Sequence, residues 1–299
     1  MTVEYTQNGS AKIAYETFGD PSGEPLLLIM GLDFQMVYWP DDFCRTLVDR
    51  GFFVARFDNR DAGLSQHFTS VQQRHPVAAL FRRDRMPAYT GADMVGDGLA
   101  VMDALGWKSA HVAGASLGGF LAVATALGHP DRVRSLALLL ATPSGTRASL
   151  RYIRFGFLGK MAKIKHPDTD EGAIQTLVDI SRAQSSPGNP VDVTWARQVA
   201  EIAHHRAPRD QSGTQRQLAA VRSYPGLSAR RLPVSAPTIV VNGEDDPLLR
   251  GPAAARALAK AIPGATATVL PAMGHDLPAP HWSRIADAIA ANAGMSHAS

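Results

Sequence analysis

Residues 114–118 read Gly-Ala-Ser-Leu-Gly and place Ser116 between two glycines. The apolar residues 111–113 before them predict the end of a buried strand, and residues 117–129 after them predict a helix. A G-x-S-x-G sequence at a strand-to-helix junction is typical of a nucleophile elbow, where a sharp turn lifts the serine hydroxyl clear of the backbone. The motif therefore predicts an α/β architecture with a reactive serine at the end of a strand.

Residues 237–242 form a later apolar segment that we predict to be another strand, and an acidic turn follows it. Residues 243–247 of this turn read Gly-Glu-Asp-Asp-Pro. An ionised carboxylate at a strand end can orient an imidazole and offset its positive charge. We choose Asp246 as this acid because Pro247 fixes the backbone directly after it. Glu244 and Asp245 remain alternatives.

The histidine that completes this chemistry is predicted from its position. His275 lies just after the last predicted strand, residues 265–270, and is the only one of ten histidines that follows a late strand on a glycine-containing loop. The carboxyl ends of parallel strands meet at one edge of a sheet, so we expect Ser116, Asp246 and His275 to come together. The order nucleophile, acid, histidine indicates a catalytic triad.

An oxyanion in such a site needs two backbone N–H donors. Leu117 supplies one from the start of its helix, and Leu32 supplies the other from the loop after the third strand, where Gly31 allows close approach. Gly31 and two neighbours of the triad, Ala115 and Met273, are our predicted substrate-binding residues.

Strand-like and helix-like segments alternate along most of the chain, which predicts a mainly parallel sheet covered by helices on both faces. We expect eight strands in this sheet. A hairpin signal at Asn8-Gly9 joins the first two, residues 3–5 and 12–18. Other strands are predicted at 25–30, 52–57 and 133–140, and helices at 41–50, 90–106, 252–262 and 282–291.

The strand pattern disappears between residues 143 and 231, where helix-like segments predict a cap over the active site. The chain then divides into a core part (1–142), a cap insertion (143–231) and a second core part (232–299). In residues 150–164, apolar side chains recur at helical spacing with basic residues beside them. A basic amphipathic lid and an ordinary cap helix both fit this pattern, and two glycines favour the cap helix.

The turn at residues 58–63, Asp-Asn-Arg-Asp-Ala-Gly, invites comparison with a metal or phosphate loop. It lacks the lysine that a phosphate loop needs and the ligand cluster that a metal needs. We therefore predict a turn held by Arg60, with no metal and no cofactor.

Several of these stretches together resemble the α/β-hydrolase superfamily, and most closely the bacterial esterases that include the aclacinomycin (anthracycline) methylesterases. The resembling stretches are 26–31 with Trp39-Pro40 after it, 56–65, 114–118, 244–247 and 273–275. The resemblance implies a serine hydrolase that cleaves esters of small to medium apolar substrates through an acyl-enzyme. This chain departs from the family pattern at Met30-Gly31, where many members have histidine-glycine. No histidine therefore braces the loop after the third predicted strand.

Other reactions remain open within this fold. A C–C hydrolase or lactonase, a cofactor-free haloperoxidase or perhydrolase, and a non-catalytic ligand-binding protein can all keep the same triad. The serine at the elbow excludes epoxide hydrolases and haloalkane dehalogenases of this fold, which use an aspartate there.

Composition limits the partners. The chain has 299 residues, of which 45% are hydrophobic and 19% charged, as in an ordinary soluble protein. A net charge of +3 is too small to indicate nucleic-acid binding. The single cysteine, Cys44, is expected to pack in a helix. We find no signal peptide and no membrane span, and we expect a cytoplasmic enzyme whose partner is an ester substrate, with a homodimer left open.

Overall fold

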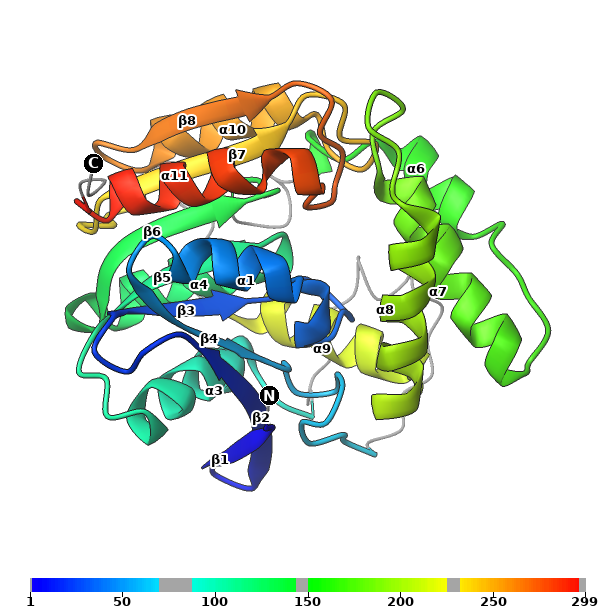
Figure 1. The fold of residues 1–299 in the computed structure, drawn as a ribbon, viewed down its shortest axis with the longest axis horizontal. Coiled ribbons are helices and arrows are strands. Elements are labelled where there is room, and N and C mark those ends of the chain that lie inside the picture. The colour runs from blue at the N-terminus through cyan, green and yellow to red at the C-terminus, as the bar shows by residue number, and fades with distance from the viewer. Residues whose placement is uncertain (1, 70–87, 144–149, 225–231, 296–299) are drawn as a thin grey trace.

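The computed structural model describes residues 2–69, 88–143, 150–224 and 232–295. An eight-stranded sheet forms its centre, with the strand order β1-β2-β4-β3-β5-β6-β7-β8 (Figure 1). The β1–β2 and β2–β4 pairs are antiparallel, and the other pairs are parallel. The strands are β1 (Glu4–Asn8), β2 (Ala11–Phe18), β3 (Glu24–Ile29), β4 (Phe52–Phe57), β5 (Ala110–Ala115), β6 (Val133–Leu139), β7 (Thr238–Gly243) and β8 (Thr266–Leu270).

The central strands are apolar along most of their length because helices cover both faces of the sheet. Every residue of β4, β5 and β7 is buried, as expected for strands with no solvent-facing side. Two apolar clusters, one on each face, form the core. The predicted fold, a mainly parallel eight-stranded sheet between helices, is confirmed.

Helices α1 and α11 pack on one face, and α3, α4 and α10 pack on the other (Figure 1). Their bounds are α1 (Asp41–Val48), α3 (Gly91–Ala104), α4 (Leu117–Gly128), α10 (Gly251–Ala261) and α11 (Trp282–Asn292), with short 3₁₀ turns η1 (Met36–Tyr38), η2 (Pro130–Arg132) and η3 (Ala279–His281). Cys44 lies fully buried in α1, and burial raises the pKa of its thiol to about 12. It is a packing residue, as predicted.

The start of α3 shows how local sequence sets an element. Thr90 and Asp93 form a reciprocal capping box, in which the Thr90 hydroxyl accepts from the Asp93 N–H and the Asp93 carboxylate accepts from the Thr90 N–H. Gly106, at φ 71°, follows the last turn and has the left-handed conformation that commonly ends a helix. Both predicted ends of this helix are therefore close to the observed ones.

The helices named in the described residues between the two core parts are α6 (Phe155–Met161), α7 (Asp170–Gln184), α8 (Val193–Arg206) and α9 (Gln211–Ser223). Helices α7 and α8 pair as a hairpin that stands beyond the carboxyl ends of the strands (Figure 1). Helix α9 packs against α3 of the core. All four fall inside the predicted cap insertion, whose boundaries stay a prediction.

The prediction of a continuous amphipathic helix over residues 150–164 is wrong. Residues 151–154 are not helical: Ile153 forms an antiparallel bridge with Leu249, and a helix begins at Phe155 and ends at Met161. The Arg154 N–H donates to the Leu248 carbonyl, and the Arg250 N–H donates to the Tyr152 carbonyl. Pairing with the loop after β7 supplies these backbone groups with partners, which explains why the helical spacing of the side chains did not decide the structure.

Candidate active site

The turn between β5 and α4 holds Ser116 in a conformation that few side chains adopt. Its φ is 53° and its ψ is −113°, a strained region that the surrounding structure must maintain. Gly114 and Gly118 make this turn possible. A Cβ on Gly114 would lie 2.2 Å from the Gly118 carbonyl oxygen, and one on Gly118 would lie 2.0 Å from the Ile29 carbonyl oxygen. The predicted elbow is therefore present in its expected geometry.

Asp246 follows β7 and is 1% exposed. Its Oδ1 accepts hydrogen bonds from the Leu248 and Leu249 N–H groups at 2.8 and 2.7 Å. These two bonds fix the carboxylate and leave Oδ2 at 2.7 Å from Nδ1 of His275. An aspartate that binds N–H groups two and three residues ahead is a common turn, so the Asp-Pro-Leu-Leu sequence carried a second signal that our choice of Asp246 did not use.

The two alternative acids lie elsewhere. Glu244 is exposed. Asp245 is also exposed, and its carboxylate accepts a hydrogen bond from the Ser186 hydroxyl at 2.6 Å. Of the three acids, the contact with His275 belongs to Asp246.

His275 lies between the acid and the serine. Its Nε2 is 3.2 Å from the Ser116 Oγ, and the imidazole is nearly buried. Its backbone N–H donates to the Gln184 carbonyl at the end of α7, at 2.7 Å. A Cβ on the preceding Gly274 would lie 2.2 Å from that same carbonyl oxygen, so the close approach requires glycine. Sequence reasoning missed Gln184, because a backbone carbonyl carries no sequence signal.

Asp276 adds a second carboxyl beside His275. Burial raises the pKa of Asp276 to about 7, against the lowering effect of the Gly274 N–H, which donates to its Oδ1. The nearby Asp246 carboxylate raises it further. Near neutral pH this carboxyl therefore exchanges a proton next to the triad.

The two predicted oxyanion donors, the Leu117 and Leu32 N–H groups, belong to segments beside Ser116. Leu117 begins α4 directly after Ser116. The loop that carries Leu32 passes close to the serine, as shown by Gly31: a Cβ built there would lie only 3.3 Å from the Ser116 Cβ. Within the described residues, neither the Leu117 nor the Leu32 N–H donates to another group. Their assignment to an oxyanion hole stays a prediction.

The other predicted substrate-binding residues are less open. Ala115 is 4% exposed and Met273 is fully buried, and both side chains belong to the apolar cluster on the α1–α11 face. Their side chains pack in the core, whereas Gly31 lies against Ser116. A contribution of Ala115 or Met273 to substrate binding stays a prediction.

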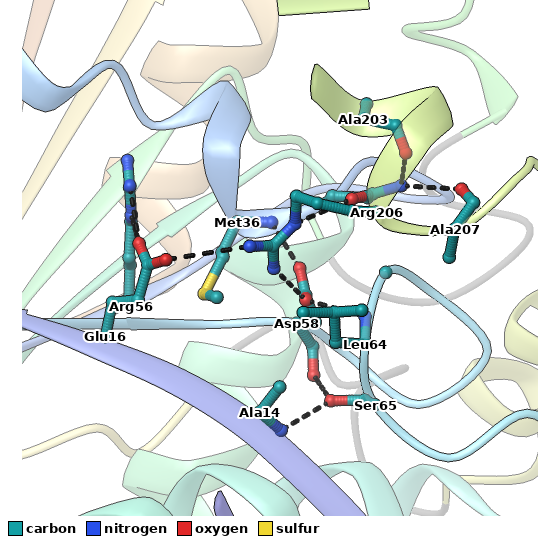
Figure 2. A network of polar contacts seen from close by, with 12 residues as sticks. Ala14, Glu16, Met36, Arg56, Asp58, Leu64, Ser65, Ala203, Arg206 and Ala207 are labelled. Carbon is teal, nitrogen blue, oxygen red and sulfur yellow. Dashed lines mark hydrogen bonds and ion pairs between the residues drawn. The ribbon is translucent and has the colours of Figure 1, made fainter. Parts of the chain in front are cut away.

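The turn after β4 is joined to the cap by buried ion pairs that the sequence did not reveal. Asp58 binds Arg206 of α8 at 2.6 Å and also accepts hydrogen bonds from the Met36 and Leu64 N–H groups (Figure 2). Arg206 also faces Glu16, which pairs with Arg56.

A second pair, Asp61 with Arg216 of α9, lies at 2.8 Å. Arg60, which we predicted to hold the turn, pairs with Asp97 of α3 at 2.5 Å. Arg60 thus ties the turn to the core, and the two aspartates tie it to the cap.

A small polar cavity lies between this turn, the loop after β3 and the end of α8. It measures about 20 Å³ and is bordered by Asp33, Tyr38, Asp61 and Arg209, among others. This volume suits about one water molecule and is too small for an ester substrate. The cavity is therefore not the substrate site.

Two features are absent from the described residues. No helix there has the length and apolar character to cross a membrane. No group of three or more His, Cys, Asp and Glu side chains there could hold a metal ion.

A family model described as "alpha/beta hydrolase fold" matches residues 24–280. The chain belongs to this family. The match spans the elbow, the acidic turn and the histidine loop, so all three members of the candidate triad lie inside it.

Two curated relatives cover nearly the whole chain. Rhodomycin D methylesterase DnrP of Streptomyces peucetius is 30% identical, covering 98% of this chain and 98% of the relative. Rhodomycin D methylesterase DauP of Streptomyces sp. (strain C5) is also 30% identical, covering 93% of each chain. The resemblance to this group of esterases is confirmed.

Solved structures agree on the fold. A hydrolase from Pseudomonas aeruginosa PA01 matches with a TM-score of 0.69 at 24% identity, covering 98% of both chains. The esterase RhEst1 from Rhodococcus sp. ECU1013 matches with a TM-score of 0.70 at 18% identity, covering 99% of this chain and all of that one. At these identities the likeness concerns the fold.

Proposed function

We propose that this protein cleaves carboxylic esters of small to medium apolar substrates through an acyl-enzyme on Ser116. The observation that carries the proposal is the continuous chain of contacts from Asp246 through His275 to Ser116. The general class, a carboxylic ester hydrolase, follows from the family and from the two methylesterase relatives. The triad roles and the range of substrates are our own proposals.

In the first half-reaction, the Ser116 Oγ attacks the ester carbonyl while its proton passes to Nε2 of His275. Asp246 holds the imidazole through Nδ1 and stabilises the positive charge that forms. The Leu117 and Leu32 N–H groups bind the oxyanion. When the intermediate collapses, the C–O bond to the alcohol breaks, and the alcohol leaves with the proton from His275.

In the second half-reaction, a water molecule gives a proton to His275 and attacks the acyl carbonyl. The second oxyanion forms in the same N–H pair and collapses, which returns the proton to Ser116 and releases the carboxylic acid. Ester and water are consumed, and alcohol and acid are formed. His275 must be neutral at the start of each half-reaction, so activity should fall in acid.

We further propose that the alcohol side of the substrate is small and that the acid side is bulky and apolar. Both relatives are named as methylesterases, which supports a methyl leaving group. A polycyclic acid ester of this type contrasts with the long-chain triglycerides that a lipase hydrolyses at an oil–water interface.

A panel of esters tests this proposal. We expect turnover of p-nitrophenyl acetate and butyrate and of the methyl ester of an anthracene carboxylic acid, with weak activity on triolein emulsion. Ser116→Ala should be inactive on all of them. A sharp rise of activity at the interface with strong triolein turnover contradicts the substrate range, and near-zero turnover of every ester by the wild type favours a ligand-binding protein instead.

We also propose a cytoplasmic enzyme that binds neither nucleic acid nor membranes. The oligomeric state can be measured by light scattering during gel filtration, and a mass twice that of the chain would establish a homodimer.

A further inference from the structure

The loop after β3 carries the Leu32 N–H in the peptide between Gly31 and Leu32. The peptides on both sides of it are held by side-chain amides. The Met30 carbonyl accepts from Nδ2 of Asn59 at 3.0 Å, and the Asp33 N–H donates to Oε1 of Gln217 at 2.9 Å. The orientation of the Leu32 N–H is therefore set by its two neighbouring peptides.

Of these two amides, Gln217 comes from the cap. It lies in α9 and is 0% exposed. Its Nε2 donates to the Arg60 carbonyl at 2.7 Å. Because the NH₂ group faces a carbonyl, the opposite atom facing the Asp33 N–H must be the oxygen, so both bonds agree on one orientation of the amide. Gln217 thus bridges the loop after β3 to the turn after β4.

The loop needs such a brace for two reasons on its own backbone. Gly31 has no Cβ to restrict its peptide. Asp33 has φ 68°, a left-handed conformation that persists when neighbouring contacts hold it. The residue before the glycine is Met30, whose side chain is buried among apolar residues and supplies no polar contact.

We propose that Gln217 is a positioning residue that holds the Leu32 N–H toward the oxyanion. The inference rests on the proposed function, in which Leu32 is one of the two oxyanion donors. Gln217 touches no reacting atom and acts through the Leu32–Asp33 peptide. The cap then contributes to the chemical step through one buried amide, as well as covering the site.

A positioning role has a kinetic signature that a purely structural role lacks. An oxyanion donor acts in the transition state, so its misplacement lowers kcat and leaves KM nearly unchanged. Because an amide does not titrate, the loss should be equal at every pH, with the shape of the pH profile unchanged. A trifluoromethyl ketone, which forms an oxyanion adduct with the serine, should bind more weakly by the same factor as kcat/KM falls. The carboxylic acid product should bind as before.

The test uses three variants of the full chain. Gln217→Met keeps the size of the side chain and removes both hydrogen bonds. Gln217→Glu keeps an acceptor for the Asp33 N–H and loses the donor toward Arg60. Gln35→Met is the matched control, since Gln35 is also buried and joins the same loop to the cap, but through the carbonyls of Ala203 and Ala207 and through the Nε–H of Arg206, which donates to its Oε1.

We expect Gln217→Met to lower kcat about tenfold or more, a part of the 10²–10³-fold cost of deleting an oxyanion donor. Gln217→Glu should lie between it and the wild type. Gln35→Met should stay within about twofold of the wild-type kcat, although its thermal midpoint falls. If Gln217→Met does not fold, Gln217→Glu decides by the same comparison of kcat, KM and ketone binding.

An unchanged kcat in folded Gln217→Met, or an equal fall of kcat in Gln35→Met, would overturn the inference. Failure of the proposed function looks different. In that case a fluorophosphonate does not label Ser116 in the wild type at all. Normal labelling of the wild type together with full activity of Gln217→Met contradicts the role of Gln217 alone.

Discussion

The sheet and the α7–α8 hairpin are held by different interactions. The sheet buries two extensive apolar clusters, one on each face. The hairpin has a small apolar cluster of its own, in which three of the six buried residues are alanines. Besides the apolar contact of α9 with the core, a set of ion pairs joins the cap to the core: Asp58–Arg206, Asp33–Arg209 and Asp61–Arg216, in which each acid belongs to the core and each base to the cap.

This difference separates stability from geometry. Apolar burial is non-directional and stabilises the sheet in proportion to the area removed from water. Buried ion pairs are a weak source of net stability, but removing one partner is costly. They fix positions, and here they act on the two loops that surround the oxyanion site. In the mechanism that we propose, the core supplies the reactive groups, and the cap holds the loops beside them.

The largest expected effect lies in the core. Asp246→Asn should lower kcat by about 10⁴-fold, because an amide cannot hold the imidazole in the required tautomer. This substitution leaves the contacts between the cap and the core in place. We therefore expect a loss of kcat and not the loss of stability that the cap variants below should show. Steady-state kinetics on a soluble p-nitrophenyl ester measure the effect.

Glu244→Gln and Asp245→Asn are the matched controls for that variant. Both side chains are exposed, and both substitutions should leave kcat within about tenfold of wild type. If either control were the most damaging of the three, Asp246 would not be the triad acid.

On the cap side, Arg206→Leu should lower the free energy of unfolding by about 3–5 kcal/mol, because it leaves the Asp58 carboxylate buried without its cation. The two side chains are 13% and 0% exposed. Urea unfolding measures the loss. Arg197→Leu is the control, since its pair with Glu171 is 42% and 65% exposed and should contribute little to stability.

A double variant sharpens the comparison. Replacing a whole buried pair by apolar residues is often neutral. Asp58→Leu combined with Arg206→Met should still be destabilised, by about 1–3 kcal/mol for each of the Met36 and Leu64 N–H groups left unpaired. A double variant as stable as the wild type would mean that the hydrogen bonds from the Met36 and Leu64 N–H groups to Asp58 do not contribute to stability.

The core was predictable from the sequence because its signals are local. The elbow depends on the glycines around Ser116, and the buried strands depend on continuous apolar runs. Their order along the chain, with the acid and the histidine after late strands, then brings the triad to one edge of the sheet.

The cap was not predictable in the same way. Arg206 and Gln217 lie on helices among other polar residues, and their importance comes from partners about 150 to 180 positions earlier in the chain, Asp58 and Asp33. Residues 152–154 kept helical spacing but paired with the loop after β7. Long-range partners of single polar side chains leave no pattern in one sequence.

Asp276 gives a pH-dependent prediction beside the triad. Its pKa in the folded protein, about 7, lies above the value near 3.9 of an unfolded aspartate. The folded state therefore holds a proton that the unfolded state has lost, and the contribution of this group to stability is full below pH 4 and falls as the pH rises to 7. The slope should reach at most about 1.4 kcal/mol per pH unit.

Asp276→Asn should flatten the unfolding free energy between pH 4 and 7, measured by urea unfolding at each pH. Asp245→Asn, an exposed carboxylate close in sequence to the triad acid, is the control. Equal curves for Asp276→Asn and wild type would contradict the raised pKa.

The smallest expected effect concerns the contact between the cap and the acidic turn. Ser186→Ala removes the bond to Asp245 and the acceptor for the Gly188 N–H, and should lower the free energy of unfolding by about 1 kcal/mol with kcat nearly unchanged. Ser185→Ala, at a half-buried neighbouring site where the hydroxyl makes one local bond to the Arg182 carbonyl, should cost less. A large loss of kcat in Ser186→Ala would show that this contact positions the triad.

The central claim, that the core carries the chemistry on Ser116, is tested most directly by covalent labelling. The wild-type protein is incubated with a fluorophosphonate, and the modified peptide is mapped by mass spectrometry. The account predicts one adduct per chain on Ser116, slower labelling of Asp246→Asn, and neither label nor ester hydrolysis in Ser116→Ala. An adduct on another serine, with Ser116→Ala still hydrolysing esters at the wild-type rate, would contradict it.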